Sequence, residues 1–319
     1  MELKELKRTK NSTKKSVVLK GSKASKMAEN ELKKFIRMLL RELDVGFRND
    51  VINQIPSQYI DGAFTDANYA SSTMSLSKKF FKKFKKRYSR DIIKKKVKML
   101  FNKQSRLNRE KFNRSVSDSL GIDLDKIMAS DGLSSFQNAQ EIETLEQIMR
   151  LMDETISSYT SEVNRKLGKE NTTLGDLYKS IKKETGMKLK RGDTTARNQL
   201  KEFNTQLSEK RATKLGIQKA RWKTGGDERV RCTHRYLGQY KNLDGSKGFE
   251  YVVADGITME LLNKRNVTDS QTCDMAVKGS DKKSNRTMQF SKEIDANGGK
   301  LKPGEGINCR CYAEYVVEF

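Results

Sequence analysis

Proline and long apolar runs are nearly absent from this sequence. Only two of the 319 residues are proline. Because proline removes a backbone donor and kinks a helix, this scarcity favours long, uninterrupted helices. No run of 18 apolar residues occurs, so the sequence predicts no transmembrane helix and no membrane anchor. Residues 1–5 lack the apolar core of a signal peptide.

Cysteine and histidine are also scarce, and this excludes several kinds of site. Four cysteines in a chain of this length do not make a disulfide scaffold, so a reducing cytoplasm is the expected environment. The single histidine excludes metal sites and mechanisms that need two. The sequence has no Gly-Lys-Ser/Thr phosphate loop and no Gly-x-Gly-x-x-Gly motif. We therefore expect no enzymatic activity.

Positive charge is abundant and unevenly distributed. The chain has 65 Lys and Arg against 41 Asp and Glu, a net charge of +24. Residues 216–319 carry 18 basic and 14 acidic residues, or +4, which leaves +20 on residues 1–215. Such an excess fits a polyanionic partner, either nucleic acid or an anionic membrane. We expect the affinity for DNA to lie in residues 1–103.

Residues 78–103 are the most basic segment, with 13 lysines and arginines and one acidic residue, Asp91. Apolar residues such as Phe81, Phe84 and Tyr88 fall along one helical face. The pattern suits a solvated helix whose stripe faces the core, and it equally suits a helix that binds the phosphates of double-stranded DNA. A membrane-surface helix would look similar. The candidates for DNA contact are Lys78, Lys79, Lys82, Lys83, Lys85, Lys86, Arg87, Arg90, Lys94, Lys95 and Lys96.

The apolar periodicity predicts an α+β protein that is mainly helical over its first two-thirds. Helical spacing is found over four stretches, residues 32–43, 142–163, 174–181 and 194–215. The first is expected to end near Gly46, the third before Gly186 and the fourth at Gly216. Residues 53–76 have poor periodicity and are expected to form a loop.

Beyond residue 216 the apolar period changes from 3.6 to 2, which predicts a small α+β domain with a mostly antiparallel sheet. The strand candidates are residues 217–223, 229–234, 249–254 and 307–319. Three regions are therefore expected: a basic arm over 1–27, a helical domain over 28–190 and the α+β domain over 191–319, with an irregular insertion at about 264–300. The arm is too polar to bury much surface, so we expect it to order only against a partner.

The rarest residue types cluster in the last region. On a strand, Cys309 and Cys311 would share the buried face with Ala313 and Tyr315, because side chains alternate between faces. The same alternation puts Val230, Cys232 and His234 on one face, with Arg229 and Arg231 on the other. We expect the strand over 307–319 to pair with residues 217–234 and to bring both cysteines close to His234.

Four interpretations of this cluster remain open. Cys232, His234, Cys309 and Cys311 offer four soft ligands, the right number for zinc, although their Cys-x-His and Cys-x-Cys spacings are tighter than usual zinc ligand pairs. Buried thiols also behave as small apolar groups, with the histidine hydrogen-bonded to a neighbour. A Cys–His dyad is the third interpretation, but it needs an exposed thiolate. A disulfide between cysteines of the cluster is the fourth. No cofactor is required by the sequence, and zinc is the candidate.

A wider pattern surrounds these residues. It includes Ala196-Arg-Asn-Gln, Asn204, the run from Lys214 through Trp222 to Arg231, His234, Gly238, Pro303-Gly and Asn308-Cys-Arg-Cys-Tyr-Ala-Glu. This pattern resembles the phage head morphogenesis family, the minor head proteins of the Mu F type and the SPP1 minor-head type. The resemblance is specific over about 191–319 and looser over about 80–190. The matching motif residues are Trp222, Asp227, Glu228, Arg229, Arg231, His234, Cys309, Arg310 and Cys311, whereas Cys232 stands where proline is more usual.

The resemblance implies a minor capsid protein of a tailed bacteriophage, assembled in the host bacterial cytoplasm and carried in the virion interior. Its implied partners are the portal protein, the scaffold or major capsid protein during assembly, and double-stranded DNA. It implies no catalytic reaction. Two alternative hypotheses are kept. One is a nucleic-acid-acting enzyme, nuclease or toxin-like, with its site around Asp227, Arg231 and His234. The other is a cytoplasmic nucleic-acid-binding protein, which the net charge of +24 fits but which gives no reason for the Cys/His cluster.

Overall fold

The structure is a computed structural model, and it confirms the α+β class. It describes residues 16–20, 23–55, 67–127, 132–167, 173–225, 230–276, 283–304, 309 and 311–318. The chain forms two compact units. A helical unit comprises residues 26–102 and 136–197, and a sheet unit comprises residues 1–25, 103–135 and 198–319.

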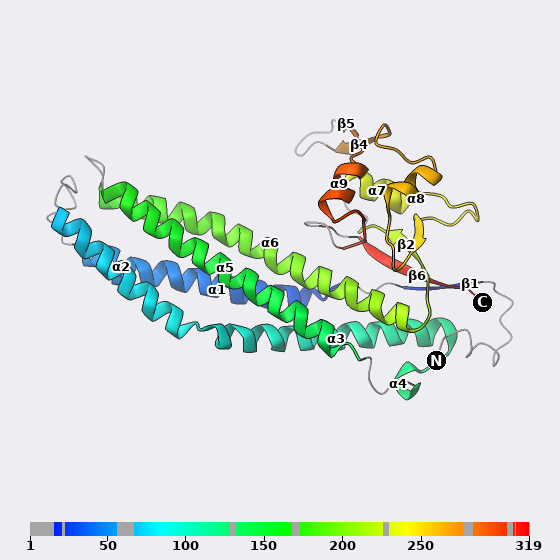
Figure 1. The fold of residues 1–319 in the computed structure, drawn as a ribbon, viewed down its shortest axis with the longest axis horizontal. Helices are drawn as coiled ribbons and strands as arrows, with labels where there is room; N and C mark the ends of the chain where they lie inside the picture. The colour runs from blue at the N-terminus through cyan, green and yellow to red at the C-terminus, as the bar shows by residue number, and fades with distance from the viewer. Residues whose placement is uncertain are drawn as a thin grey trace. The chain divides into compact units, whose positions relative to one another are not determined.

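Long helices dominate the first two-thirds of the chain, as predicted (Figure 1). They are α1 (Lys26–Asp50), α2 (Ala67–Arg87), α3 (Arg90–Leu120), α5 (Ser134–Leu167) and α6 (Leu174–Lys214), with a short 3-10 turn, η2, at Ile52–Gln54. The first part of α3 and the first part of α6 belong to the helical unit, and their remainders belong to the sheet unit. Residues 53–76, expected to be a loop, include η2 and the first part of α2.

The core of the helical unit is built on aromatic rings from three helices. Phe47 of α1 is fully buried. It stacks on Phe81 of α2 with ring centroids 5.3 Å apart, and it lies 5.2 Å from the ring of Tyr159 on α5. Phe80 and Phe84 of α2 extend this cluster. The aromatic stripe seen in the sequence therefore faces the core, and the lysines between the rings face outward.

The basic segment is two helices rather than one. α2 ends at Arg87, and α3 begins at Arg90 after a break at Tyr88 and Ser89. The break resets the helical phase, so Ile93 is buried while Ile92 is 48% exposed. In a single unbroken helix, Ile92 would lie on the buried face instead of Ile93.

Two glycines expected to end helices lie inside them. α1 runs through Gly46, and α6 runs through both Gly186 and Gly192 to Lys214. A Cβ on Gly192 would lie 2.7 Å from a methyl carbon of Ile36, and one on Gly46 would lie 2.7 Å from the ring of Phe80. Gly46 and Gly192 therefore allow close helix packing and do not act as stops.

The sheet unit contains a four-stranded antiparallel sheet in the order β1-β6-β2-β3. Its strands are β1 (Ser16–Leu19), β2 (Lys219–Lys223), β3 (Glu250–Val252) and β6 (Tyr312–Glu318). The predicted pairing of the last strand with the 217–223 region is confirmed: Trp222 of β2 lies opposite Ala313 of β6. One face is apolar, with Ala220, Trp222 and Tyr315 buried against the core.

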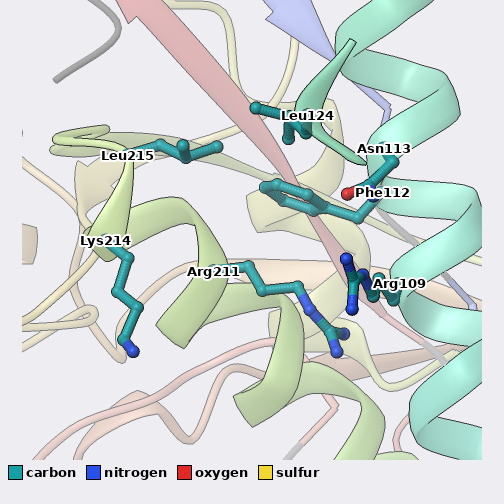
Figure 2. A pocket seen from close by; sticks show the side chains of 7 residues that line it. All are labelled: Arg109, Phe112, Asn113, Leu124, Arg211, Lys214 and Leu215. Atoms are coloured by element: carbon teal, nitrogen blue, oxygen red, sulfur yellow. The ribbon is translucent and has the colours of Figure 1, made fainter. Parts of the chain in front are cut away.

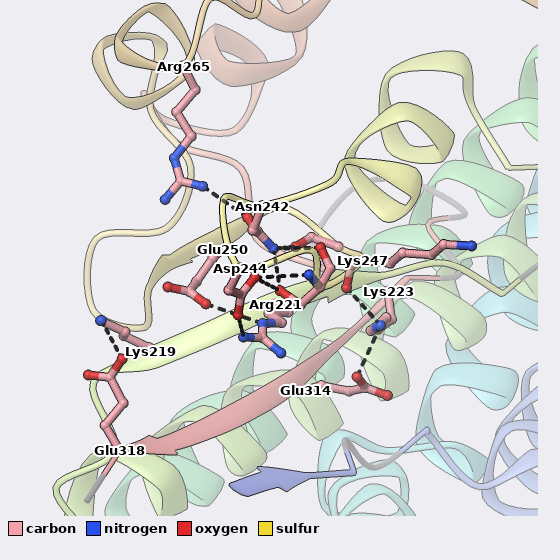
Figure 3. Close-up of polar contacts among 12 residues, drawn as sticks. Lys219, Arg221, Lys223, Asn242, Asp244, Lys247, Glu250, Arg265, Glu314 and Glu318 are labelled. Carbon is pink, nitrogen blue, oxygen red and sulfur yellow. Dashed lines mark hydrogen bonds and ion pairs between the residues drawn. The ribbon is translucent and has the colours of Figure 1, made fainter. Parts of the chain in front are cut away.

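The other face of the sheet carries ion pairs. Figure 3 shows Arg221 between Asp244 and Glu250, at 3.0 and 3.2 Å. In the same view Lys223 contacts Glu314 at 3.3 Å, and Lys219 contacts Glu318 at 2.6 Å. Each basic residue of β2 is thus neutralised by an acidic residue of its own unit.

Part of the basic arm forms a strand, so the expectation that the arm orders only against a partner was wrong for residues 16–19, while residues 1–15, 21 and 22 lie outside the described residues. Ser16–Leu19 form the edge strand β1, which pairs with Tyr315–Glu318 of β6. The apolar residues Val17, Val18 and Leu19 explain this, since Leu19 is 1% exposed and packs in the core. The remaining described arm residues approach α3: the amide of Lys20 donates to Ser115 Oγ, and that of Ser25 to Gln104 Oε1.

Short elements complete the sheet unit, and two of them contradict the sequence prediction. They are α4 (Leu124–Ile127), α7 (Cys232–Gln239), α8 (Met259–Lys264), the hairpin β4 (Thr272–Ala276) and β5 (Lys283–Thr287), and α9 (Phe290–Ala296). The strand predicted over 229–234 was wrong, because Cys232 already begins helix α7. The insertion at 264–300 is also more regular than expected, since it holds the hairpin and α9.

Candidate functional site

Cys309 and Cys311 lie immediately before β6 and point into the core of the sheet unit. The predicted alternation holds here: Cys311, Ala313 and Tyr315 share the buried face. The two cysteines are only 3% and 6% exposed, respectively. Both are free thiols. They are therefore positioned by the register of β6 against β2.

His234 comes to the same place from helix α7. It is 2% exposed, and its ring packs edge-on against the indole of Trp222, with centroids 5.0 Å apart. Its Nδ1 lies 3.4 Å from Cys309 Sγ and 3.6 Å from Cys311 Sγ. The predicted approach of both cysteines to His234 is confirmed, although a helix rather than a strand delivers the histidine.

Glu293 contacts the other side of the imidazole ring. Its Oε2 lies 2.8 Å from His234 Nε2, and Thr233 Oγ1 donates to its Oε1 at 2.9 Å. Arg231 Nη1 is 3.5 Å from the same carboxylate. Glu293 was missed by the sequence analysis because it lies on α9, within the stretch expected to be irregular. Phe290 and Ile294, buried and four residues apart, are the helical signal that marks α9.

Backbone amides surround the Cys309 sulfur. The amides of Gly304 and Cys311 donate to Cys309 Sγ at 3.3 and 3.5 Å. Gly304 has φ of +91°, and a Cβ there would lie 2.3 Å from Thr205 Oγ1, so only glycine fits. Lys201 of α6 donates to the carbonyl of Cys309 at 2.5 Å. These contacts fix the position of the sulfur.

The electrostatics of the cluster follow from these contacts. Burial acts to lower the pKa of His234, but the contacts with Cys309 and Glu293 outweigh it and raise the pKa to about 9. Burial acts to raise the pKa of Glu293, and the contact with His234 overcomes this and lowers it. The hydrogen bond between the two thiols lowers the pKa of Cys309 and raises that of Cys311. Each of these shifts favours the charged form of Cys309, His234 and Glu293.

The structure separates Cys232 from the four-ligand set considered from the sequence. Cys232 is disulfide-bonded, so its sulfur is not free to act as a fourth ligand. The described residues that bring ligand atoms within 4.8 Å of one another are His234, Cys309 and Cys311. Of the other motif residues, Trp222 is fully buried beside His234. Asp227, Glu228, Arg229 and Arg310 lie outside the described residues.

The nuclease or toxin alternative places its site around Asp227, Arg231 and His234, of which Asp227 lies outside the described residues. Arg231 is partly exposed and pairs with Glu293. His234 is buried, and both of its ring nitrogens already face protein groups. This conformation therefore offers no exposed histidine to a nucleic acid substrate.

The candidate DNA-binding residues form a separate surface on α2 and the start of α3. All of them are exposed except Lys96, which is half-buried. Three of them contact acidic groups of the helical unit: Lys85 with Asp153, Arg87 with Glu42 and Arg90 with Glu146. Among the described residues, no ion pair is seen for Lys78, Lys79, Lys82, Lys83, Lys86, Lys94, Lys95 and Lys96.

Two hollows in the sheet unit are lined without cysteine or histidine. Figure 2 shows the first, where Phe112 of α3 lies near Leu124 and Leu215 with Arg109 and Arg211 beside it. The ring of Phe112 also packs edge-on against Tyr315 of β6, with centroids 6.1 Å apart. The second hollow is basic and is lined by Lys20, Lys23, Lys111, Arg114, Ser115, Asp118 and Ser119.

Comparison with known proteins identifies a family that resembles part of the chain. Residues 168–314 match the family model described as Phage Mu protein F like protein. The matched range includes all of α6, the sheet strands β2 and β3, and the whole His234–Cys309–Cys311 cluster. No curated protein and no solved structure matches the chain. Among the helices that the structure describes, none has the length and apolar character needed to cross a membrane.

Proposed function

Through residues 168–314 the chain belongs to the Phage Mu protein F like family of phage head morphogenesis proteins, and on this basis we propose that it is a minor capsid protein of a tailed bacteriophage. In this proposal it lies inside the head, contacts the portal protein and the packaged double-stranded DNA, and meets the scaffold or major capsid protein during assembly. Its role is structural. The observation that carries the proposal is the family match.

Two features of the matched region suit a structural role. The chemically distinctive side chains are buried, with His234, Cys309 and Cys311 at 2%, 3% and 6% exposure. Buried groups of this kind stabilise a fold more readily than they meet a substrate. The ion pairs of Arg221 with Glu250 and of Lys223 with Glu314 likewise join strands of the same sheet. The matched region therefore resembles a rigid module that other head proteins could dock against.

The proposed contact with DNA rests on the helical unit. Lys78, Lys79, Lys82, Lys83 and Lys86 are exposed on α2, and no ion pair is seen for them among the described residues. Lysines that lack acidic neighbours keep their full charge available for phosphate, and binding then releases counterions. Such contacts are independent of sequence, which suits a protein that meets any stretch of a packaged genome.

The proposal can be tested in the phage whose genome encodes this chain. Purified DNA-filled heads should contain the protein in few copies per portal, and external protease should not digest it until the heads are opened. The protein should also co-purify with the portal protein when the two are co-expressed. Absence from purified heads, or full digestion in intact heads, would contradict a location inside the head.

A matched pair of variants separates the DNA contact from the assembly role. Replacing Lys78, Lys79, Lys82, Lys83 and Lys86 with Gln should leave co-purification with the portal unchanged and weaken DNA binding. The control replaces five exposed lysines of the sheet unit, Lys241, Lys247, Lys264, Lys292 and Lys300, and so removes the same charge. Equal weakening of DNA binding in both variants would place the DNA contact elsewhere.

A further inference from the structure

The donor atoms of the buried cluster meet in a small space. His234 Nδ1, Cys309 Sγ and Cys311 Sγ all lie within 4.8 Å of one another. In a tetrahedral zinc site, the Zn–N and Zn–S bonds of about 2.0–2.1 and 2.3 Å place the nitrogen about 3.6 Å from each sulfur. The observed separations are 3.4 and 3.6 Å. We propose that these three residues bind one zinc ion in the sheet unit.

A chain of hydrogen bonds through Cys309 links the three residues without requiring Cys311 Sγ to approach Nδ1 of His234. One ring nitrogen has either a single proton or a single lone pair, so Nδ1 can make one good in-plane hydrogen bond. Two sulfurs nevertheless lie at nearly equal distances from Nδ1 of His234. A metal ion between the three atoms would satisfy all of them at once.

The groups around the donors support metal binding. Metal-bound histidines almost always contact a carboxylate or carbonyl through their second nitrogen, and such a contact orients the ring. Glu293 takes this place at 2.8 Å from His234 Nε2, and Thr233 holds its other oxygen. The amides of Gly304 and Cys311 donate to Cys309 Sγ, as expected for a thiolate ligand.

The chemical types of the three donor atoms indicate which metal ion would bind. Two thiolates and an imidazole favour zinc over magnesium or calcium, which prefer oxygen ligands. Cys232 is excluded as a donor because it is disulfide-bonded. Three protein donors leave a fourth coordination position for water or a further protein group. Because all three donors are buried, the ion would serve the stability of the sheet unit.

The test uses the full chain purified without a polyhistidine tag, since a tag would bind metal itself. Elemental analysis should find about one zinc per chain, and X-ray absorption should show two sulfur ligands at about 2.3 Å with nitrogen or oxygen at about 2.0–2.1 Å. Cys309→Ser, Cys311→Ser and His234→Ala should each lose the ion. Glu293→Gln should keep it with about 10–100-fold weaker affinity.

Cys232→Ser is the matched control, because it removes a cysteine sulfur two residues from His234 that is not a donor, and it should retain zinc. Zinc content measured on the wild-type protein tests the proposal even if the donor variants fail to fold. Wild type that is folded, with Cys309 and Cys311 reduced, and still free of zinc after equilibration with Zn²⁺ would overturn the proposal. So would zinc loss in Cys232→Ser together with zinc retention in Cys309→Ser, or rapid alkylation of Cys309 in zinc-treated protein.

Discussion

The helical unit and the sheet unit use charged residues in opposite ways. In the sheet unit, the basic residues of β2 are paired with acidic groups, and the most distinctive titratable side chains are buried around His234. In the helical unit, the core is aromatic and aliphatic, and a row of lysines on α2 faces outward with no ion pair seen among the described residues. The comparison supports the proposal that fold stability and contact with DNA are assigned to different parts of the chain.

Truncating one large buried ring in each unit gives the largest expected effect. Trp222 and Phe47 are both fully buried. Trp222→Ala and Phe47→Ala should each destabilise by about 3–5 kcal/mol, because each leaves a large cavity. In hydrogen exchange, Trp222→Ala should lower protection in β2 and β6, whereas Phe47→Ala should lower it in α1 and α2. Identical exchange patterns in both variants would contradict the division of the chain into two units.

The next largest expected effect is the loss of stability when a buried residue of the edge strand β1 is truncated. Leu19 is 1% exposed and lies opposite Tyr315 of β6. Leu19→Ala should lower the free energy of unfolding of the sheet unit by about 2–5 kcal/mol. Ser16→Ala, at an exposed position of the same strand, should change it by less than about 0.5 kcal/mol. Urea denaturation measures both, and equal midpoints would show that β1 adds nothing to the sheet.

Alanine substitutions at two glycines of α6 should change the stability of the helical unit in opposite directions. At Gly186 a Cβ meets nothing within 4 Å, so Gly186→Ala should stabilise the helical unit by about 1 kcal/mol through helix propensity. At Gly192 a Cβ would lie 2.7 Å from Ile36, so Gly192→Ala should destabilise it by about 1–3 kcal/mol through overpacking. Thermal unfolding of the two variants checks the contrast. A higher melting temperature for both would mean that the approach to Ile36 is not tight.

The sequence predicted features that depend on local periodicity. Alternation over 311–317 identified the buried face of β6, and the grouping of rare residues identified the neighbourhood of His234, Cys309 and Cys311. Short apolar runs are ambiguous between helix and strand, which is why Val230, Cys232 and His234 suggested a strand where α7 begins. The break at Ser89 was also hidden, because Ile92 and Ile93 offer an apolar residue in either phase.

Features that depend on distant contacts could not be predicted. β1 pairs with a strand about 300 residues away, and nothing in the composition of the arm indicates a partner. Glu293 reaches His234 only because α9 packs beside α7 in the folded chain. The close approach of Ile36 to Gly192 is equally invisible in the sequence. In each case tertiary packing decides what a residue does, and local preference does not.

The salt dependence of DNA binding tests the division between the two units most directly. Wild-type protein should bind DNA less tightly as salt rises, because each phosphate contact adds about 0.9 to the slope of log affinity against log salt. The α2 variant, with Gln at Lys78, Lys79, Lys82, Lys83 and Lys86, should have a smaller slope. The expected reduction is about 0.9 for each of these lysines that binds a phosphate. The variant with Gln at the five exposed lysines of the sheet unit should keep the wild-type slope. An unchanged slope in the α2 variant, or an equal reduction in both, would contradict the account.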